Sequence, residues 1–311
     1  MKQVVSSARS IMPPDVGLSL SDGEFDAISR VIRQETGIVI TAPKRSMLVS
    51  RLARRLRALG LPDFSAYLRL LEGEAGEAER EQLVSAITTN VTSFFREPHH
   101  FEALAGMLPA FLERAKAGGR IRIWSAGCST GQEAYSIAAT ILEHSPELAR
   151  LDLRILATDI DPVVVETARQ GIYDQRLLGD NPPRAIRRFI EERQGSGNIA
   201  VAPALRSLIR FEVLNLLETW PFAGKFDVIF CRNVVIYFDA ETRRSLWTRF
   251  AGRIPAGGVL FIGHSERMDP LLEPCFTPTG MTQYLRTPHE APGDHGGMRG
   301  YTPARRAAEC P

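Results

Sequence analysis

The feature that most constrains the fold is a change of pattern after Ala117-Gly118-Gly119. From there on, short apolar runs that favour strands alternate with amphipathic stretches that favour helices. This alternation is typical of βαβ units, in which parallel strands form a sheet with helices on both faces. The sequence therefore predicts an α/β domain with a Rossmann-like, doubly wound sheet.

The strands of this sheet are expected at residues 121–124, 153–158, 208–214, 226–231 and 259–263. A helix is expected at 133–142. Another is expected from Asp161-Pro162 to Gly171, because aspartate suits the N-cap and proline suits the first helical turn. The polar stretch at about 174–207 is too long for an ordinary connection, and it predicts a small inserted β-subdomain.

An all-helical domain is predicted to precede the sheet. Its first helix shows the S-x-x-E spacing of a capping box from Ser21 to Glu24, and apolar residues recur at helical intervals up to Gly37. A second helix, 44–59, carries a stripe of leucines beside a basic face. The expected boundaries are 15–87 for the helical domain, 88–287 for the α/β domain and 288–311 for a disordered tail rich in proline, glycine and charge.

Composition excludes several classes of protein. The chain of 311 residues has a formal charge of only +2, which does not favour general binding to nucleic acid. Its four cysteines are far apart and form no CxxC pair, so no disulfide, zinc site or other metal site is expected. Neither a signal peptide nor an apolar run of membrane-spanning length is apparent. We therefore expect a cytoplasmic protein without membrane insertion, and nothing demands more than a monomer.

Residues 88–97, Thr-Thr-Asn-Val-Thr-Ser-Phe-Phe-Arg-Glu, combine aromatic rings with several short donors and acceptors. A core element does not easily accommodate both kinds of side chain. Such a segment suits a lid or linker over a small polar ligand. His99 and His100 follow Pro98 and are expected at the start of a helix, without a catalytic role.

The turn after the first strand, 125–133, carries two glycines where the backbone turns tightly. It lacks the G-x-G-x-x-G pattern of dinucleotide sites, and no lysine follows Gly131 as it would in a phosphate-binding P-loop. A nucleoside without phosphates, such as S-adenosylmethionine (SAM), fits this pattern. The alternative is a plain βα turn in which Thr130 and Glu133 form a capping box.

Polar residues follow several strands at the edge where a ligand would bind. Asp159 ends the second strand, where a carboxylate can accept both hydroxyls of a ribose, although an Asx-type cap before Asp161 is an equal alternative. Asn215-Leu216 and Arg232-Asn233 follow the next two strands. The carboxyl ends of parallel strands lie at one edge, so these residues are expected to converge.

Besides the 88–97 segment, four segments resemble the CheR-type chemotaxis receptor methyltransferases in the expected order, at 128–136, 157–161, 230–239 and 263–266. The resemblance covers about 19–286 and implies SAM-dependent methylation of glutamate side chains on chemoreceptors, with S-adenosylhomocysteine as product. It implies that the cofactor contacts Asn90, Thr92, Arg96, Glu133, Asp159, Asn215, Leu216, Arg232 and Asn233. It also implies that Arg96 and Tyr237 lie beside the transferring methyl group.

The expected chemistry constrains Arg96. A glutamate with a pKa of about 4.3 is ionised at neutral pH, so no general base is needed. A tight clamp on that carboxylate would stabilise the ground state more than the transition state, so Arg96 is expected to orient or gate the reactants. Tyr237 is expected to aim the carboxylate with one hydrogen bond. The alternatives are an ion pair between Arg96 and an acid such as Glu97, and a packing role for Tyr237.

Basic residues of the second helix, Lys44, Arg51, Arg54 and Arg55, are expected to lie on one face and to dock the acidic helices of chemoreceptors. A solvated face without a partner is the plainer alternative, and RNA is disfavoured because the helix lacks interleaved aromatic residues. In some members of the family that this chain resembles, the inserted subdomain captures a short receptor tail by adding a strand to its edge. The loop around 195–197 is short compared with such members, so this chain is not expected to depend on a tethering tail peptide. Two other functions stay open: a SAM-binding regulatory module, and a methyltransferase with a different substrate.

Overall fold

The computed structural model describes residues 18–178, 183–193 and 195–289. The chain divides into two compact units. The helical unit comprises the described residues up to Val31 together with Ile40–Ile87, and the sheet unit comprises Ile32–Val39 and the residues from Thr88 onward. The expected disordered tail lies outside the described residues from position 290. None of the described helices is long and apolar enough to cross a membrane.

The helical unit is built from α1 (Asp22–Thr36), whose last turn is counted with the sheet unit, and from η1 (Ala42–Lys44), α2 (Arg45–Leu59), α3 (Phe64–Glu72), η2 (Glu74–Gly76) and α4 (Glu77–Ile87). The predicted capping box is confirmed, because the backbone N–H and the hydroxyl of Ser21 both donate to Glu24 Oε2, at 2.9 and 2.7 Å. Leu48, Leu52 and Leu56 of the predicted leucine stripe are fully buried and form the core-facing side of α2, whereas Leu59, the fourth predicted member, is exposed at the end of the helix.

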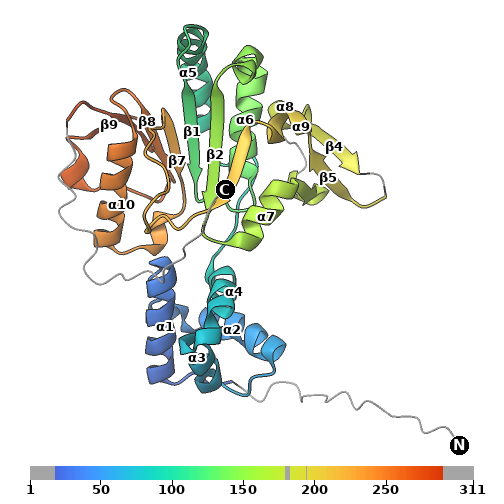
Figure 1. The fold of residues 1–311 in the computed structure, drawn as a ribbon, viewed down its shortest axis with the longest axis vertical. Coiled ribbons are helices and arrows are strands. Elements are labelled where there is room, and N and C mark those ends of the chain that lie inside the picture. The colour runs from blue at the N-terminus through green and yellow to red at the C-terminus, as the bar shows by residue number, and fades with distance from the viewer. Residues whose placement is uncertain (1–17, 179–182, 194, 290–311) are drawn as a thin grey trace, which may run out of the picture. The chain divides into compact units, whose positions relative to one another are not determined.

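The sheet unit is built around a seven-stranded sheet with the order β6-β2-β1-β7-β8-β10-β9 (Figure 1). Its strands are β1 (Ile121–Ala126), β2 (Leu153–Asp159), β6 (Ile209–Val213), β7 (Val228–Cys231), β8 (Val259–Ile262), β9 (Phe276–Gly280) and β10 (Gln283–Arg286). The pairs from β6 through β8 are parallel, and β10 is antiparallel to both β8 and β9. The predicted Rossmann-like sheet is therefore confirmed, with every predicted strand present.

The antiparallel strands β9 and β10 are absent from the sequence-based prediction. β9 contains Pro278, and only its first residue, Phe276, is buried. It therefore shows neither an apolar run nor an alternating pattern. Proline is tolerated there because β9 is an edge strand.

Helices cover both faces of the sheet. On one face, Leu104 of α5 (His99–Lys116) and Ile137 of α6 (Gln132–His144) belong to the same core as Ile123 of β1. On the other face, Phe250 of α10 (Ala240–Arg253) packs against Trp124, with ring centroids 5.3 Å apart. Successive residues of β1 thus enter different cores, as expected for a strand buried on both sides. The remaining helices of this part are η3 (Pro146–Arg150), α7 (Pro162–Gln170), η5 (Val235–Tyr237) and η6 (Pro270–Leu272).

The predicted inserted β-subdomain is a separate antiparallel sheet with the order β3-β5-β4. Its elements are β3 (Ile172–Asp174), η4 (Gln175–Leu178), α8 (Arg184–Arg187), β4 (Ile190–Arg193), β5 (Asn198–Val201) and α9 (Pro203–Arg206). Ile186 and Ile199 are fully buried in the same core as α6. The subdomain is therefore packed onto the main sheet unit through apolar contacts.

Candidate functional site

The candidate site lies at the carboxyl edge of the parallel strands. The chain runs from β1 to β2 and β6 on one side, and then continues with β7 and β8 on the other side of β1. Ligands of open α/β sheets bind outside the carboxyl ends of the strands at such a switch point. The residues that follow β1, β2 and β7 are therefore the first candidates for binding groups.

The turn after β1 is tightly packed against the end of β7. Gly127 has a φ of +90°, and a Cβ atom there would lie 2.3 Å from Cγ2 of Val234, so only glycine fits. Gly131, at φ +95°, is the N-cap of α6. The alternative of a capping box is wrong, because Thr130 donates to Gln132 and Glu133 binds other side chains.

Asp159 at the end of β2 is a buried carboxylate, 8% exposed. It accepts the backbone N–H of Ser129 at 2.8 Å and that of Asp161 at 3.1 Å. Burial raises the pKa of Asp159 to about 6, although these hydrogen bonds lower it. The Asx-type contact with Asp161 is thus present, but each carboxylate oxygen has two lone pairs, so the group can still accept ribose hydroxyls.

The 88–97 segment lies over the turn after β1. The side-chain amide of Asn90 donates to Asp161 Oδ2 at 2.9 Å, and the backbone carbonyl of Asn90 accepts a hydrogen bond from the hydroxyl of Ser129 at 3.1 Å. Further along, the N–H of Phe95 donates to the hydroxyl of Ser136 in α6, at 2.9 Å. Thr92 lies between these two anchors and is half-buried.

Arg232 joins the 88–97 segment to the strand ends. Its side chain is only 2% exposed, and its guanidinium lies 3.0 Å from Glu133 Oε2 and 3.2 Å from Glu97 Oε2 and also donates to the carbonyl of Arg96. The other oxygen of Glu133 accepts the hydroxyl of Ser125 at 2.7 Å. A buried charge of this kind is stable only when it is paired and hydrogen-bonded, and two carboxylates meet that need.

Glu97 has a strongly perturbed acidity. Burial would raise its pKa, but the charge of Arg232 and hydrogen bonds from His264 lower it to about 2. Its Oε1 atom lies 3.0 Å from Nδ1 of His264. Glu97 therefore pairs with Arg232 and His264, and the alternative ion pair between Arg96 and Glu97 does not form. The guanidinium of Arg96 instead donates to the carbonyl of Val91 at 3.1 Å.

Glu266 holds the backbone that leads from β7 to Tyr237. Its buried carboxylate accepts N–H groups from Asn233, Val234 and Val235, at 3.1, 2.9 and 2.9 Å. A fourth N–H, from Gly263, completes the set. Asn233 has a φ of +61°, so this strained turn is fixed by a single side chain.

Asn215 and Leu216 lie beside Asp159, since the N–H of Leu214 donates to the Asp159 carbonyl at 2.9 Å. The amide of Asn215 donates to the carbonyl of Glu35 at 3.0 Å. Leu216 is buried. Tyr237 is half-buried, and its carbonyl accepts the N–H of Val39 at 3.0 Å. The structure thus brings Asn90, Glu133, Asp159, Asn215, Leu216, Arg232 and Asn233 to one sheet edge.

The predicted docking face of α2 needs correction. Arg55 pairs with buried Glu79 of α4, with Nε 3.0 Å from Oε1, and Tyr67 donates to the same oxygen at 2.8 Å. Arg51 donates to the carbonyl of Ile87 at 2.5 Å. These two arginines therefore stabilise the helical unit internally, because α4 packs beside α2. Arg54 is exposed and Lys44 is half-buried.

Some residues at the site were not singled out by sequence reasoning. Glu97 and Ser129 contribute contacts, and Asp161 was considered only as a helix cap. Glu266 belongs to a motif segment, but its role was not anticipated. The sequence Gly-His-Ser-Glu at 263–266 gives no signal that its glutamate binds the backbone at the end of another strand.

The fold and the site define a Rossmann-like domain that binds a nucleoside cofactor at its switch point. Residues 90–285 match the family described as CheR methyltransferase, SAM binding domain, and residues 23–88 match CheR methyltransferase, all-alpha domain. The chain belongs to the CheR methyltransferase family. It is a SAM-dependent methyltransferase.

Named relatives agree with this assignment. The chain is 47% identical over 260 residues to a "Probable chemotaxis protein methyltransferase" of Rhizobium etli, covering 83% of this chain and 97% of that protein. It is 42% identical over 270 residues to the "Chemotaxis protein methyltransferase" of Escherichia coli K12, covering 86% of this chain and 92% of that protein. Among solved structures, magnesium protoporphyrin IX methyltransferase from Synechocystis is 16% identical over 72% of this chain and 91% of that chain, with a TM-score of 0.34, which is too low to inform the site.

The side chains at the sheet edge fit SAM. A ribose requires an acceptor for its hydroxyls, and Asp159 has a carboxylate at the end of β2. The methionine part of SAM carries an ammonium and a carboxylate, and Glu133 and Arg232 offer charges of both signs. The turn after β1 carries no lysine, and SAM needs no phosphate-binding group.

Proposed function

We propose that the chain transfers the methyl group of SAM to glutamate side chains on the cytoplasmic helices of chemoreceptors. It would thus act as a protein-glutamate O-methyltransferase in the cytoplasm, as a monomer, and release S-adenosylhomocysteine. The similarity to chemotaxis methyltransferases supports the pathway, and the side chains at the sheet edge support the chemistry.

One observation carries this proposal: Arg232 contacts both the carbonyl of Arg96 and the carboxylate of Glu97. Arg96 belongs to the 88–97 segment, and Tyr237 ends the 3-10 helix that follows Arg232. The two residues proposed to act on the methyl group are thereby attached to the same end of β7. This arrangement suits a site in which one segment covers the cofactor and the other aims the acceptor.

We assign the cofactor contacts accordingly. Asp159 binds the ribose, Glu133 and Arg232 face the methionine part, and Asn90 and Thr92 cover the cofactor from the 88–97 segment. The other proposed contacts are Arg96, Asn215, Leu216 and Asn233. The hydrogen bonds of Asn90 to Ser129 and Asp161 support its placement, because they hold the segment against the turn after β1.

The acceptor carboxylate needs no general base. Glutamate is ionised at neutral pH, since its ordinary pKa is about 4.3. Bound SAM supplies a methyl group on a positive sulfonium, and transfer to a carboxylate cancels the two charges. Removing water from the carboxylate therefore favours transfer, whereas a tight cationic clamp would oppose it. We propose that Arg96 orients the reactants loosely and that Tyr237 aims the carboxylate with a hydrogen bond.

Receptor docking is proposed for the basic face of α2. Arg54 is its exposed member, and Lys44 begins the same face. Arg51 and Arg55 contribute less than the sequence predicted, because both have partners inside the helical unit. The positive charge that remains still favours acidic receptor helices.

We further propose that receptor recognition does not depend on a tail peptide. The β4 to β5 connection around Gly195 and Gly197 is short. Titrating the purified chain with peptides from receptor C-termini should give no binding at micromolar concentration. Micromolar binding would overturn this part of the proposal.

The proposed function is tested by incubating the chain with methyl-labelled SAM and chemoreceptor-containing membranes, followed by mild base. Base-labile label on the receptors is the expected result, because carboxyl methyl esters hydrolyse easily. Binding of SAM without transfer would indicate a regulatory module. Label on another molecule would indicate a different substrate.

A further inference from the structure

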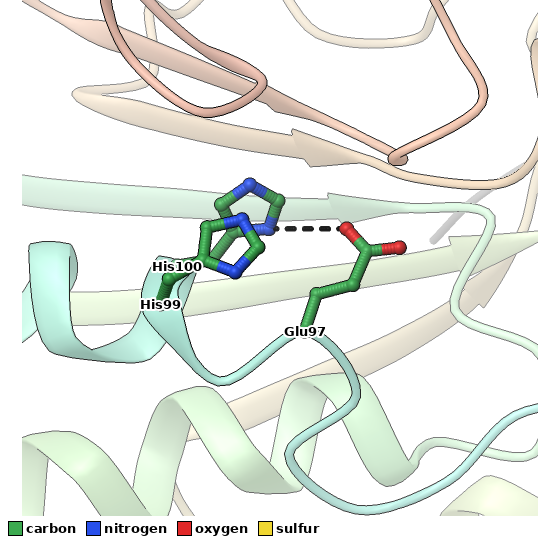
Figure 2. A group of neighbouring side chains, drawn as sticks. All are labelled: Glu97, His99 and His100. Atoms are coloured by element: carbon green, nitrogen blue, oxygen red, sulfur yellow. Dashed lines mark ion pairs between the residues drawn. The ribbon is translucent and has the colours of Figure 1, made fainter.

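Glu97, His99 and His100 form a cluster at the start of α5 (Figure 2). Each offers a potential ligand atom, and these atoms lie within 4.8 Å of one another. His99 Nε2 and His100 Nδ1 are buried and have no hydrogen-bond partner among the described residues, whereas Glu97 Oε2 is buried and lies 3.2 Å from the guanidinium of Arg232. Buried polar atoms normally have partners, so two unpartnered ring nitrogens beside a buried carboxylate require an explanation.

The hydrogen bonds of His100 identify its tautomer. His100 is fully buried, and its Nε2 atom lies 2.9 Å from Oγ1 of Thr282 and 3.3 Å from the carbonyl of Met281. The Thr282 hydroxyl donates to the same Met281 carbonyl at 2.8 Å, so its oxygen is left to accept from Nε2. Both neighbours of Nε2 are therefore acceptors, which places the ring proton on Nε2 and leaves a lone pair on Nδ1.

This lone pair faces another acceptor. His100 Nδ1 lies 3.7 Å from Glu97 Oε2, joined by the dashed line in Figure 2, and this is too long for a direct hydrogen bond. An ionised carboxylate and an imidazole lone pair repel each other unless a cation or a donor lies between them.

We propose that Glu97, His99 and His100 bind a divalent transition-metal ion of the zinc type. Two neutral imidazoles and one carboxylate are a common ligand set for such ions, with water completing the coordination. Ligand atoms of a tetrahedral zinc site lie roughly 3.3 Å apart, given metal–ligand distances of about 2.0 Å. The Glu97–His100 separation of 3.7 Å is close to that value, and the ligand atom of His99 lies within 4.8 Å of both.

The surroundings match the second shell of a metal site. Metal-binding histidines usually donate their other ring N–H to a carbonyl or another acceptor, as His100 does to Met281 and Thr282. Glu97 Oε1 is held by His264. Arg232 lies 3.2 Å from Glu97 Oε2 and would share this oxygen with the ion, and the carboxylate of Glu133 offsets part of the added charge.

The ion would have a structural effect on the neighbouring site. It would tie the end of the 88–97 segment to the first turn of α5 and fix the carboxylate that pairs with Arg232. The cluster lies outside the residues proposed to contact SAM or the methyl group, so this inference does not rest on the proposed function. The E-x-H-H spacing matches no familiar metal motif, and the cysteine spacing had predicted no metal site.

The test is a titration of the purified, chelator-treated full chain with Co²⁺, followed by visible absorption, and with Zn²⁺, followed by calorimetry. The proposal predicts binding of about one ion per chain. His99→Ala should weaken binding by about tenfold or more, since it removes one ligand from a half-buried position. His144→Ala, a histidine on α6 outside the cluster, is the matched control and should leave binding unchanged.

A second readout guards against a variant that does not fold. At the same Zn²⁺ concentration, the rise in melting temperature should be clearly smaller for His99→Ala than for the wild type and His144→Ala. The melting temperature of each variant without metal reports whether it folds. The absence of Co²⁺ absorption and of a Zn²⁺-dependent shift in the wild type would overturn the proposal, as would equal affinity in the two variants. None of these measurements depends on methyl transfer.

Discussion

The guanidinium of Arg232 lies 3.2 Å from the carboxylate of Glu97, although the two residues are far apart in the sequence and no local sequence pattern predicts their contact. This contact connects the end of β7 to the 88–97 segment, and a second carboxylate, from Glu133 on α6, completes the pairing of the buried cation. Three elements are thus held together by one side chain. Removing it should be costly for the fold and for the cofactor site.

Arg232→Met should lower the free energy of unfolding by about 3–5 kcal/mol, because it leaves two carboxylates without their buried partner. Urea denaturation followed by circular dichroism measures this change. Arg244→Met is the control: Arg244 is 49% exposed and lies 2.8 Å from Asp269. Its loss should cost about 0–1 kcal/mol, as for other surface pairs. Similar losses in both variants would show that the Arg232 network does not stabilise the fold.

Glu266→Gln should destabilise the chain by about 1.5–3 kcal/mol, since an amide cannot replace a carboxylate that accepts several backbone N–H groups. The loosened turn at Asn233 should also weaken binding of S-adenosylhomocysteine. Denaturation and calorimetry report the two effects. Glu273→Gln, on an exposed glutamate, should change neither. Full stability in Glu266→Gln would mean that the turn is held by other contacts.

Cofactor affinity should depend on pH through Asp159. Its pKa is raised to about 6 by burial, so the carboxylate is ionised above this pH and protonated below it. If the ionised form accepts the ribose hydroxyls, affinity for S-adenosylhomocysteine should fall by up to about tenfold as the pH drops from about 7.5 to about 5. Calorimetry at both pH values measures this fall. Asp159→Asn should bind weakly at both, and an equal pH dependence in this variant would exclude Asp159 as the cause.

Receptor docking should respond to charge on α2. Arg54→Glu should raise the KM for receptor by about tenfold at low salt, with a smaller effect at high salt, because screening weakens surface attraction. The cofactor affinity should not change. Lys225→Glu makes the same charge change at an exposed position before β7 and should leave the KM unaltered. A KM that does not respond to Arg54→Glu at any ionic strength would remove the docking role of this face.

The parallel sheet was predictable because its strands are apolar runs separated by helical patterns, and polar residues follow several of the strands. Asp159 and Arg232 could be located in this way. Their partners could not, because the contact of Arg232 with Glu133 spans 99 positions and depends on how α6 packs beside β7. Left-handed backbone at Glu97, with a φ of +58°, also lacks a sequence signal, since glycine usually marks such positions.

The basic face of α2 illustrates a second limit. Helical periodicity separates its arginines from the buried leucines Leu48, Leu52 and Leu56. It does not reveal that Glu79 of α4 is buried and pairs with Arg55. The sequence alone does not distinguish an arginine that pairs with a buried glutamate from an exposed arginine that is available to bind another protein.

The most direct test of the proposed function is mass-spectrometric mapping of the methyl group on a purified chemoreceptor after incubation with the chain and SAM. The proposed function predicts methyl esters on glutamate side chains of the cytoplasmic helices, abolished or strongly reduced when Asp159→Asn replaces the wild type. Methylation of another residue type, or an unmodified receptor despite measurable SAM binding, would contradict it.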